Sequence, residues 1–293
     1  MKIRNLKLKN KFFLAPMLEP NDTAFRILCK KAGAALCYTG MINPLSKKKL
    51  ILDDKPAVQI FCNSVNGVSG FIKKYDKKAR LWDLNLGCPS DVAEKLGFGS
   101  YLKDIDVVEE ILKTIRKATK KPLTIKIRKS VNAEKIIKIA EKYCDAVCIH
   151  PRTKEQGYSG KADLKFALKI KKMTKIPVIY SGDVDENNFE KLLKKFDYVM
   201  IGRKAIGNPL IFSKLTGKKL KKKIELSDYL KLAEKYCLPF RQVKMQAMWF
   251  TRGMKNSRSL RRKLALSKDI DGIKKILIYA CMLLPGFEPG SQP

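Results

Sequence analysis

The chain has 293 residues and carries 62 Lys and Arg against 28 Asp and Glu, a formal net charge of +34 at pH 7. A lysine-rich thermophilic composition would raise Glu together with Lys, so this imbalance favours a polyanionic partner, nucleic acid. The eight scattered Cys and the single His do not show the spacing of a zinc site. The longest uncharged apolar run, 276–284, is far shorter than the ~20 residues that span a bilayer, and we expect a cytoplasmic protein.

Eight short apolar segments rich in Val, Ile, Leu and Ala follow in chain order, as is typical of strands that are buried on both faces. Lys- and Glu-rich stretches with apolar residues at helical spacing separate most of them, although 43–55 favours a short helix or none. Eight such units predict an α/β fold, a (β/α)8 TIM barrel. A doubly wound open sheet is the alternative, but the Gly-rich dinucleotide turn that it needs is missing. The predicted strands are 12–17, 34–39, 57–62, 81–86, 123–127, 146–150, 177–180 and 198–201.

The pattern changes after the eighth strand, where a basic hinge at 214–223 leads into four amphipathic helices, expected at 226–237, 240–252, 257–266 and 270–284. Residues 218–275 hold 18 basic and 5 acidic side chains, which makes them about twice as basic per residue as the barrel. We predict a barrel domain at 1–217, a small C-terminal four-helix domain at 218–285, and a disordered tail at 286–293. Beside Trp249 and Phe250, which are expected to stack on RNA bases, lies a basic cluster that suits RNA, formed by Arg258, Arg261, Arg262 and Lys263.

The carboxyl ends of the strands build the active site of such a barrel, so the residue types found there are informative. They comprise cations, amides, one thiol and two glycine turns, without the clustered carboxylates of a divalent-metal enzyme or a glycosidase. In strand order, these ends hold Pro16 and Met17, Thr39 and Gly40, Gln59, Asn85 and Cys88, Lys126 and Arg128, His150 and Arg152, Gly182 and Asp183, and Gly202 and Arg203.

Several of these residues point to a particular role. Cys88 follows an apolar strand at a Gly-Cys-Pro break, which predicts an accessible strand end, although the tripeptide alone fits a packing role equally well. Lys126 lies inside a strand and needs an anionic partner, either a ligand or a carboxylate such as Asp83. The glycines after the last two strands match a phosphate cradle, to which Arg203 would add a clamp. His150, the only His, is expected to contact a ligand.

The chain resembles the tRNA-dihydrouridine synthases in APM at 15–17, NLGCP at 85–89, KIR at 126–128, HPRTKEQGYSG at 150–160, SGD at 181–183 and IGR at 201–203. The resemblance implies an FMN-binding barrel that clamps tRNA together with the helical domain, and NADPH as a transient reductant. It implies that Cys88 is the general acid and that Asn85 reads the uracil edge. The implied FMN contacts are Pro16, Met17, Leu18, Gln59, Lys126, His150, Ser181, Gly182, Asp183, Gly202 and Arg203. The expected further substrate contacts are Arg128, Arg152, Arg258, Arg261 and Arg262.

The sequence departs from the family pattern at 18–21, at Pro151 and at Gln246, which falls where the helical domain of the family has a His. In the implied reaction, reduced flavin gives a hydride to C6 of an extruded uracil and Cys88 protonates C5. Two other functions stay open. A flavoenzyme for a small pyrimidine, resembling dihydroorotate dehydrogenase, would leave the basic helices without a purpose. A non-catalytic RNA-binding barrel would leave the strand-end residues unexplained. We expect a monomer.

Overall fold

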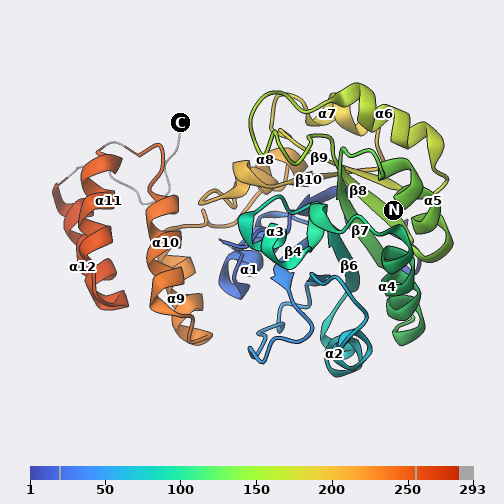
Figure 1. Ribbon diagram of the computed structural model, residues 1–293. Coiled ribbons are helices and arrows are strands. Elements are labelled where there is room, and N and C mark those ends of the chain that lie inside the picture. Colours follow the sequence, from blue (N-terminus) through green and yellow to red (C-terminus); the bar gives the residue numbers. More distant parts are fainter. Residues whose placement is uncertain (20, 255, 284–293) are drawn as a thin grey trace.

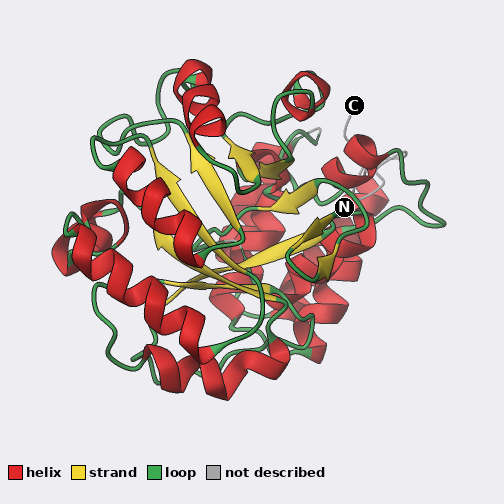
Figure 2. Cartoon of the chain, turned by 90° about the vertical axis from the view of Figure 1, so that its right-hand side faces the viewer, coloured by secondary structure: helices red, strands yellow, loops and turns green. Residues whose placement is uncertain are grey.

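The computed structural model describes residues 1–19, 21–254 and 256–283, so the predicted tail at 286–293 lies outside the described residues. It contains a closed barrel of eight parallel strands surrounded by helices (Figures 1 and 2). Each strand pairs with the next along the chain, and the last one closes the barrel on the first. The predicted barrel is confirmed, and its strand boundaries differ from the predicted ones by up to three residues. The strands are β3 (Phe12–Leu14), β4 (Leu36–Ile42), β5 (Ala57–Ile60), β6 (Leu81–Leu86), β7 (Leu123–Arg128), β8 (Ala146–His150), β9 (Val178–Ser181) and β10 (Tyr198–Ile201).

The longer helices around the barrel bury an apolar stripe. In α4 (Ile105–Ala118) the stripe is Val108, Ile111, Leu112 and Ile115, all fully buried at helical spacing. No helix connects β4 to β5 in the described residues, as the sequence indicated. The other barrel helices are α1 (Thr23–Ala32), α2 (Val68–Tyr75), α3 (Asp91–Leu96), α5 (Ala133–Tyr143), α6 (Leu164–Met173), α7 (Phe189–Leu193) and α8 (Ile211–Thr216), with 3-10 turns η1 (Asp76–Lys78), η2 (Gly99–Tyr101) and η3 (Arg203–Ala205).

A short N-terminal hairpin, β1 (Lys2–Ile3) with β2 (Leu6–Lys7), packs against the amino-terminal end of the barrel. Ile3 is fully buried in one apolar cluster with Phe13 and Tyr38. The Tyr198 hydroxyl donates to the Lys2 carbonyl at 2.9 Å. The hairpin is not predicted from the sequence, because its strands have two residues each. Since the hairpin covers this end, the barrel is accessible from the opposite end, where the strands terminate.

Four C-terminal helices lie to one side of the barrel (Figure 1) and match the predicted ones, α9 (Leu226–Lys235), α10 (Phe240–Phe250), α11 (Ser257–Leu266) and α12 (Ile270–Leu283). Helix α9 packs on α1 of the barrel. The buried Asp22 carboxylate joins the two parts, because it accepts hydrogen bonds from the Tyr229 hydroxyl at 3.0 Å and the Gln246 amide at 3.2 Å. Burial raises the pKa of Asp22. The division of the chain into two domains at residue 217 stays a prediction.

Candidate active site

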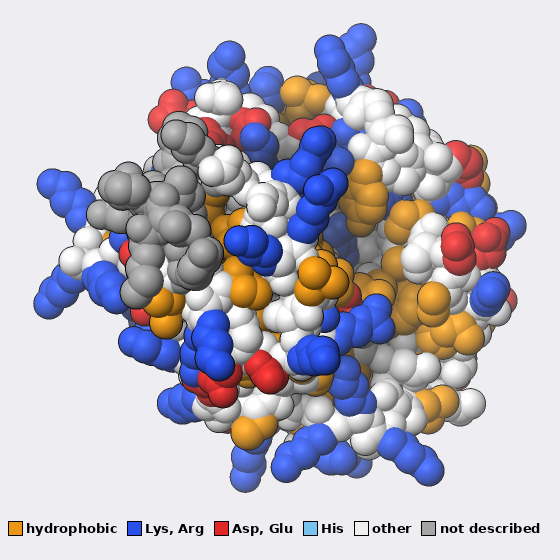
Figure 3. Space-filling model, turned by 90° about the vertical axis from the view of Figure 1, so that its left-hand side faces the viewer, with side chains coloured by type: hydrophobic (Ala, Val, Ile, Leu, Met, Phe, Trp, Pro, Cys, Tyr) orange, Lys and Arg blue, Asp and Glu red, His pale blue; other side chains and the backbone are white. Residues whose placement is uncertain are grey.

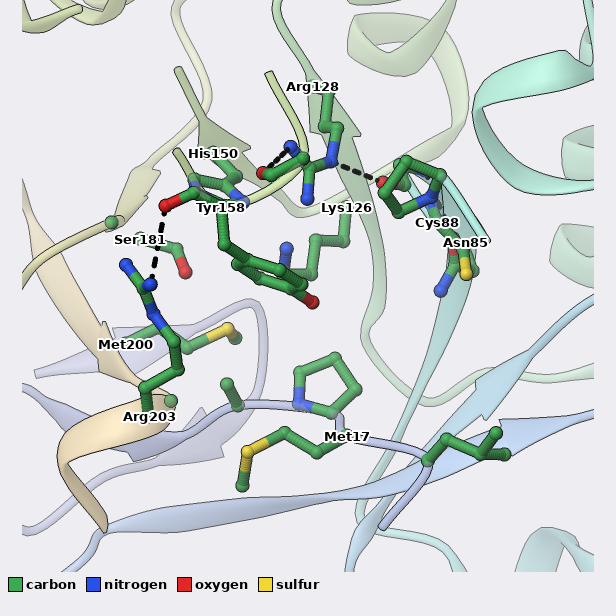
Figure 4. Close-up of a pocket in the computed structure, with 18 of the residues that line it drawn as sticks. Met17, Asn85, Cys88, Lys126, Arg128, His150, Tyr158, Ser181, Met200 and Arg203 are labelled. Atoms are coloured by element: carbon green, nitrogen blue, oxygen red, sulfur yellow. Dashed lines mark hydrogen bonds between the residues drawn. The ribbon is translucent and has the colours of Figure 1, made fainter. Parts of the chain in front are cut away.

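A cavity of about 980 Å³ opens at the carboxyl ends of the barrel strands (Figure 4), a volume typical of cofactor and substrate sites. Cys88 and Asn85 lie on one side of it, Arg203 and Met200 on the other, and Lys126 points between them. Most of the predicted cofactor and substrate residues in the barrel line its wall. These are Pro16, Met17, Leu18, Asn85, Cys88, Lys126, Arg128, His150, Ser181, Gly182, Asp183, Gly202 and Arg203. Gln59 and Arg152 lie outside the wall.

A buried chain of polar groups positions Asn85. The Asn85 amide N–H donates to Gln59 Oε1 at 2.8 Å, and Gln59 Nε2 in turn donates to Asp83 at 2.7 Å. Asn85 Oδ1 accepts the backbone N–H groups of Gly87 and Cys88 at 3.0 and 2.9 Å. This leaves one N–H of Asn85 for a ligand, which can donate to a carbonyl oxygen. Gln59, predicted to contact FMN, stands behind Asn85 instead of on the cavity wall.

Cys88 is half-buried, and the segment after α3 holds its backbone. The Ser100 hydroxyl and N–H both donate to the Cys88 carbonyl, at 2.7 and 3.1 Å. Gly99 adopts φ +60°, and a Cβ at this position would come within 3.0 Å of Cys88. Only glycine therefore fits this close approach. The Cys88 Sγ lies 3.3 Å from the Ser90 hydroxyl, so the thiol is fixed at the cavity wall with a proton-exchanging neighbour.

Lys126 projects into the cavity from β7 and is half-buried (Figure 4). Its ammonium makes no hydrogen bond or ion pair with the residues that the structure describes. Asp83, the alternative partner considered from sequence, is instead bonded to Gln59 and Thr124. Burial and the neighbouring Arg128 lower the pKa of Lys126. A lysine with three unused donors inside a barrel fits an anionic ligand.

His150 is neutral in this site. Burial and four surrounding cations lower the pKa of His150 to about 2. Arg152 Nη1 lies 3.3 Å from His150 Nε2. Because a guanidinium can only donate, Nε2 is the acceptor, and the neutral ring carries its proton on Nδ1. The surrounding cations are Lys126, Arg128, Arg152 and Arg203.

Two buried guanidinium groups hold the loop that follows β8. Arg128 donates to the carbonyls of Gly87 and Gly157, both at 2.7 Å. Arg152 donates to the carbonyl of Gly160 at 2.6 Å and pairs with Asp183 at 2.5 Å. The Arg152 side chain is only 2% exposed, so it holds this loop from the protein interior. Arg128 reaches the cavity wall as well.

Beyond β9 and β10, polar groups converge at the position expected for a phosphate. Arg203 pairs with Asp183 Oδ1 at 2.7 Å, and the backbone N–H groups of residues 203 and 204 donate no hydrogen bond within the described chain. Partial burial acts to raise the pKa of Asp183. The hydrogen bond from Arg152 and the charges of Arg152 and Arg203 outweigh this effect, so the pKa of Asp183 is lowered. Gly182 has φ +137°, and a Cβ there would lie 3.2 Å from the His150 ring. This turn therefore requires glycine.

Tyr158 is a cavity residue that the strand-end pattern of the sequence does not indicate. Its ring lines the cavity between two guanidinium groups, with centroid distances of 5.3 Å to Arg128 and 5.2 Å to Arg203. The Arg203 side chain also donates to the Tyr158 carbonyl at 3.3 Å. The available signal was its place in the segment 150–160, which carries one motif of the resemblance.

The basic cluster of the helical region lies on α11, away from the cavity wall. Arg258 and Arg262 are exposed and Arg261 is half-buried. Lys and Arg side chains are spread over this side of the molecule and along its rim, and the surface is hollowed near its middle (Figure 3). The expectation that Phe250 offers a stacking surface is wrong. Its side chain is buried and packs on Tyr229, with ring centroids 5.8 Å apart, because α10 turns this face inward.

Comparisons with known proteins agree with this arrangement. The family model described as Dihydrouridine synthase (Dus) matches residues 13–280. The tRNA-dihydrouridine synthase B of Vibrio vulnificus (strain CMCP6) is 33% identical, over 73% of this chain and 74% of that protein. The probable tRNA-dihydrouridine synthase of Rickettsia bellii (strain RML369-C) is 30% identical, over 95% of this chain and 97% of that protein.

Solved structures share the barrel at low sequence identity. The old yellow enzyme homologue from Zymomonas mobilis superposes with a TM-score of 0.52 at 11% identity, over 77% of this chain and 93% of that one. Morphinone reductase in complex with tetrahydroNAD gives 0.50 at 11% identity, over 78% and 92%. These likenesses concern the fold alone. The family match across most of the sequence shows that the chain belongs to the dihydrouridine synthase family.

Proposed function

We propose that this protein is an FMN- and NADPH-dependent oxidoreductase that reduces uridines in tRNA to 5,6-dihydrouridine. Family membership supports the reaction, and the names of the relatives support tRNA as the substrate. The observation that carries the proposal is the cavity, whose wall holds Lys126, which has no ion pair among the described residues, and the half-buried thiol of Cys88 beside the neighbouring strand end. The first group suits an anionic flavin ring, and the second suits proton donation to a base.

The residues present fit FMN. Lys126 offers an ammonium that pairs with no carboxylate in the described part of the chain, and neutral His150 offers a donor and an apolar face. Met17 and Met200 supply apolar wall. Arg203 and the adjacent free N–H groups offer donors for the phosphate. Bound FMN, once reduced by NADPH, would supply the hydride for C6 of uracil.

The remaining chemistry belongs to side chains of this protein. The free N–H of Asn85 donates to a uracil carbonyl and orients the ring. Cys88 delivers the thiol proton to C5, and Ser90 is close enough to exchange a proton with the sulfur. Arg128 and Tyr158 form the edge of the cavity, with the guanidinium 5.3 Å from the ring centroid.

A folded RNA cannot insert a paired base into this cavity, so the uridine must be extruded into it. The basic face of the molecule supplies the sequence-independent attraction for the phosphate backbone (Figure 3). A small-pyrimidine enzyme would not need this surface.

The experiment combines flavin content with a choice of substrates. The purified protein should carry FMN and, with NADPH under anaerobic conditions, should form dihydrouridine in a tRNA transcript that lacks modifications. Dihydroorotate should not reduce the flavin at a comparable rate. A flavin-free protein, or one that reacts with dihydroorotate and leaves tRNA unmodified, would overturn the proposal.

A further inference from the structure

A second cavity of about 420 Å³ lies next to the active-site cavity, and Arg128 lines both. Three loops at the same end of the barrel build it, since its wall includes 99–103 after β6, 128–132 after β7 and 153–155 after β8. Its volume lies within the range of small-ligand sites. The proposed reaction leaves it without a role. Its apolar wall consists of Leu86, Leu102, Val131, Ile136 and Phe166.

The charged side chains around this cavity are mostly basic. Lys103 is exposed and forms no ion pair with any residue in the described ranges. Lys154 lies 4.5 Å from the Tyr101 ring centre and 3.9 Å from the exposed Glu155, a distant pairing. Neither lysine is therefore committed to a close carboxylate. The charged residues on the wall are Lys103, Arg128, Lys129, Lys154 and Glu155.

Helix α5 begins at the same wall. Its first flanking residue, Asn132, makes no capping hydrogen bond and donates instead to the Lys103 carbonyl at 3.3 Å. The N–H groups of residues 134 and 135 donate no hydrogen bond within the described chain. The positive end of an 11-residue helix thus adds to the lysine charges, which makes the rim suited to an anion above an apolar floor.

The cavity is also connected to the reacting thiol. Gly99 and Ser100 form part of its wall, and the same two residues hold the Cys88 backbone in place. A ligand in this cavity would therefore contact the segment that fixes the general acid. This arrangement favours a ligand that is present together with the reacting base.

We propose that the second cavity binds a phosphate-bearing part of a nucleotide while the active-site cavity is engaged. The apolar floor accepts a base or ribose, and the basic rim accepts the phosphate. The inference rests on the proposed function, and two sources share this chemistry. One is a phosphodiester of the substrate RNA beside the extruded uridine, and the other is a phosphate of NADPH.

The test is the double variant Lys103→Ala/Lys154→Ala, compared with Lys117→Ala/Lys138→Ala. The control removes the same charge from exposed lysines on the outer faces of α4 and α5. Binding of unmodified tRNA transcript is measured across a range of salt concentrations. Flavin reduction is followed by stopped flow with NADPH and with NADH in the absence of tRNA.

If the site holds RNA, the affinity for tRNA falls in the Lys103→Ala/Lys154→Ala variant, while flavin reduction is unchanged. The slope of log affinity against log salt concentration then flattens by roughly 0.7–0.9 per lost phosphate contact. If it holds the reductant, about tenfold more NADPH is needed for half-maximal flavin reduction, while tRNA affinity is unchanged. If the Lys103→Ala/Lys154→Ala variant behaves like the control variant in both tRNA binding and flavin reduction, the inference is overturned. That failure is distinct from failure of the proposed function, in which the unaltered protein forms no dihydrouridine.

Discussion

At the scale of single residues, the site depends on polar groups that hold Cys88 and Asn85 from beneath. The side chains of Asp83, Gln59 and Asn85 are almost completely buried. Asn85 donates a hydrogen bond to Gln59, and Gln59 donates one to Asp83. Asn85 then fixes the Cys88 backbone N–H. Because buried polar groups are costly unless satisfied, this chain sets one orientation for the residues that would face uracil.

Replacement of the thiol separates the two halves of the reaction. Cys88→Ala should retain FMN and accept hydride from NADPH as before, because Cys88 serves only the transfer to uracil. Dihydrouridine formation should fall by roughly 10²–10⁴-fold, as expected for loss of a general acid. Cys237→Ala, which removes an exposed thiol on the helical side, is the matched control. Equal single-turnover rates in the two variants would contradict the role of Cys88.

Asp83 gives a pH dependence of stability that can be measured. Burial raises the pKa of Asp83 to about 7 in the folded protein, from an ordinary value of 3.8. The folded state therefore holds a proton that the unfolded chain releases, and this contribution to stability is lost as pH rises through about 7. The slope of the loss approaches about 1.4 kcal/mol per pH unit.

Asp83→Asn removes this slope, and its amide can accept from Gln59 and donate to Thr124. Denaturant unfolding should show that the stability of the variant relative to the unaltered protein increases between pH 5 and pH 7. The exposed Asp53→Asn is the control. A difference in unfolding free energy that does not change with pH would contradict a protonated Asp83.

Sequence reasoning reached the residues at strand ends because a barrel brings these positions together whatever lies between them. It could not reveal that Gln59 supports Asn85 or that Arg152 is buried against Asp183, since both depend on pairings between different strands and loops. Tyr158 lies eight residues beyond the end of β8, where strand position no longer indicates direction. The position of Phe250 could not be predicted either, because an amphipathic pattern does not tell which face of the helix packs against the rest of the protein.

At the scale of elements, the segment 97–103 carries out two tasks. It holds the Cys88 backbone through Ser100, and it forms one wall of the second cavity. Gly99 makes this possible, because its positive φ and missing side chain let the segment approach Cys88 closely. The connection after β6 thus links thiol placement to the neighbouring surface.

Gly99→Ala tests this close approach, with Gly217→Ala as the matched control. Both positions have positive φ, so each variant should lose roughly 1–2 kcal/mol of stability. Only the Gly99 variant places a Cβ against Cys88, whereas Gly217 has open space. Dihydrouridine formation should therefore slow in Gly99→Ala alone, with flavin reduction unchanged in both. Equal dihydrouridine formation rates would show that the segment does not position the thiol.

At the scale of the whole molecule, the four C-terminal helices are joined to the barrel through buried contacts. Asp22 binds Tyr229 and Gln246, and the Gly207 backbone lies so close to Trp249 that a Cβ would be 2.2 Å from its carbonyl oxygen. The basic surface of α11 is therefore carried at a set position beside the barrel (Figure 1). We infer that it serves as part of the tRNA-binding surface.

Charge reversal on α11 tests this inference. Replacing Arg258, Arg261 and Arg262 with Glu should weaken tRNA binding and flatten its salt dependence, since each phosphate contact contributes roughly −0.7 to −0.9 to the slope. Flavin content and NADPH oxidation should persist, because these residues lie away from the cavity. Filter binding measures the slope. The control reverses three exposed lysines on α4 and α5, at 113, 117 and 138. A slope equal to that of the control would remove α11 from the binding surface.

In the proposed reaction, electrons from FMN bound in the barrel reach uridine in tRNA. The most direct measurement mixes the anaerobically reduced protein with unmodified tRNA transcript in a single turnover and follows flavin absorbance and dihydrouridine together. We expect the flavin to reoxidise with one dihydrouridine formed per flavin, and not to reoxidise in Cys88→Ala on the same timescale. Flavin that stays reduced in the presence of tRNA, or that reoxidises without dihydrouridine, would contradict the proposed reaction.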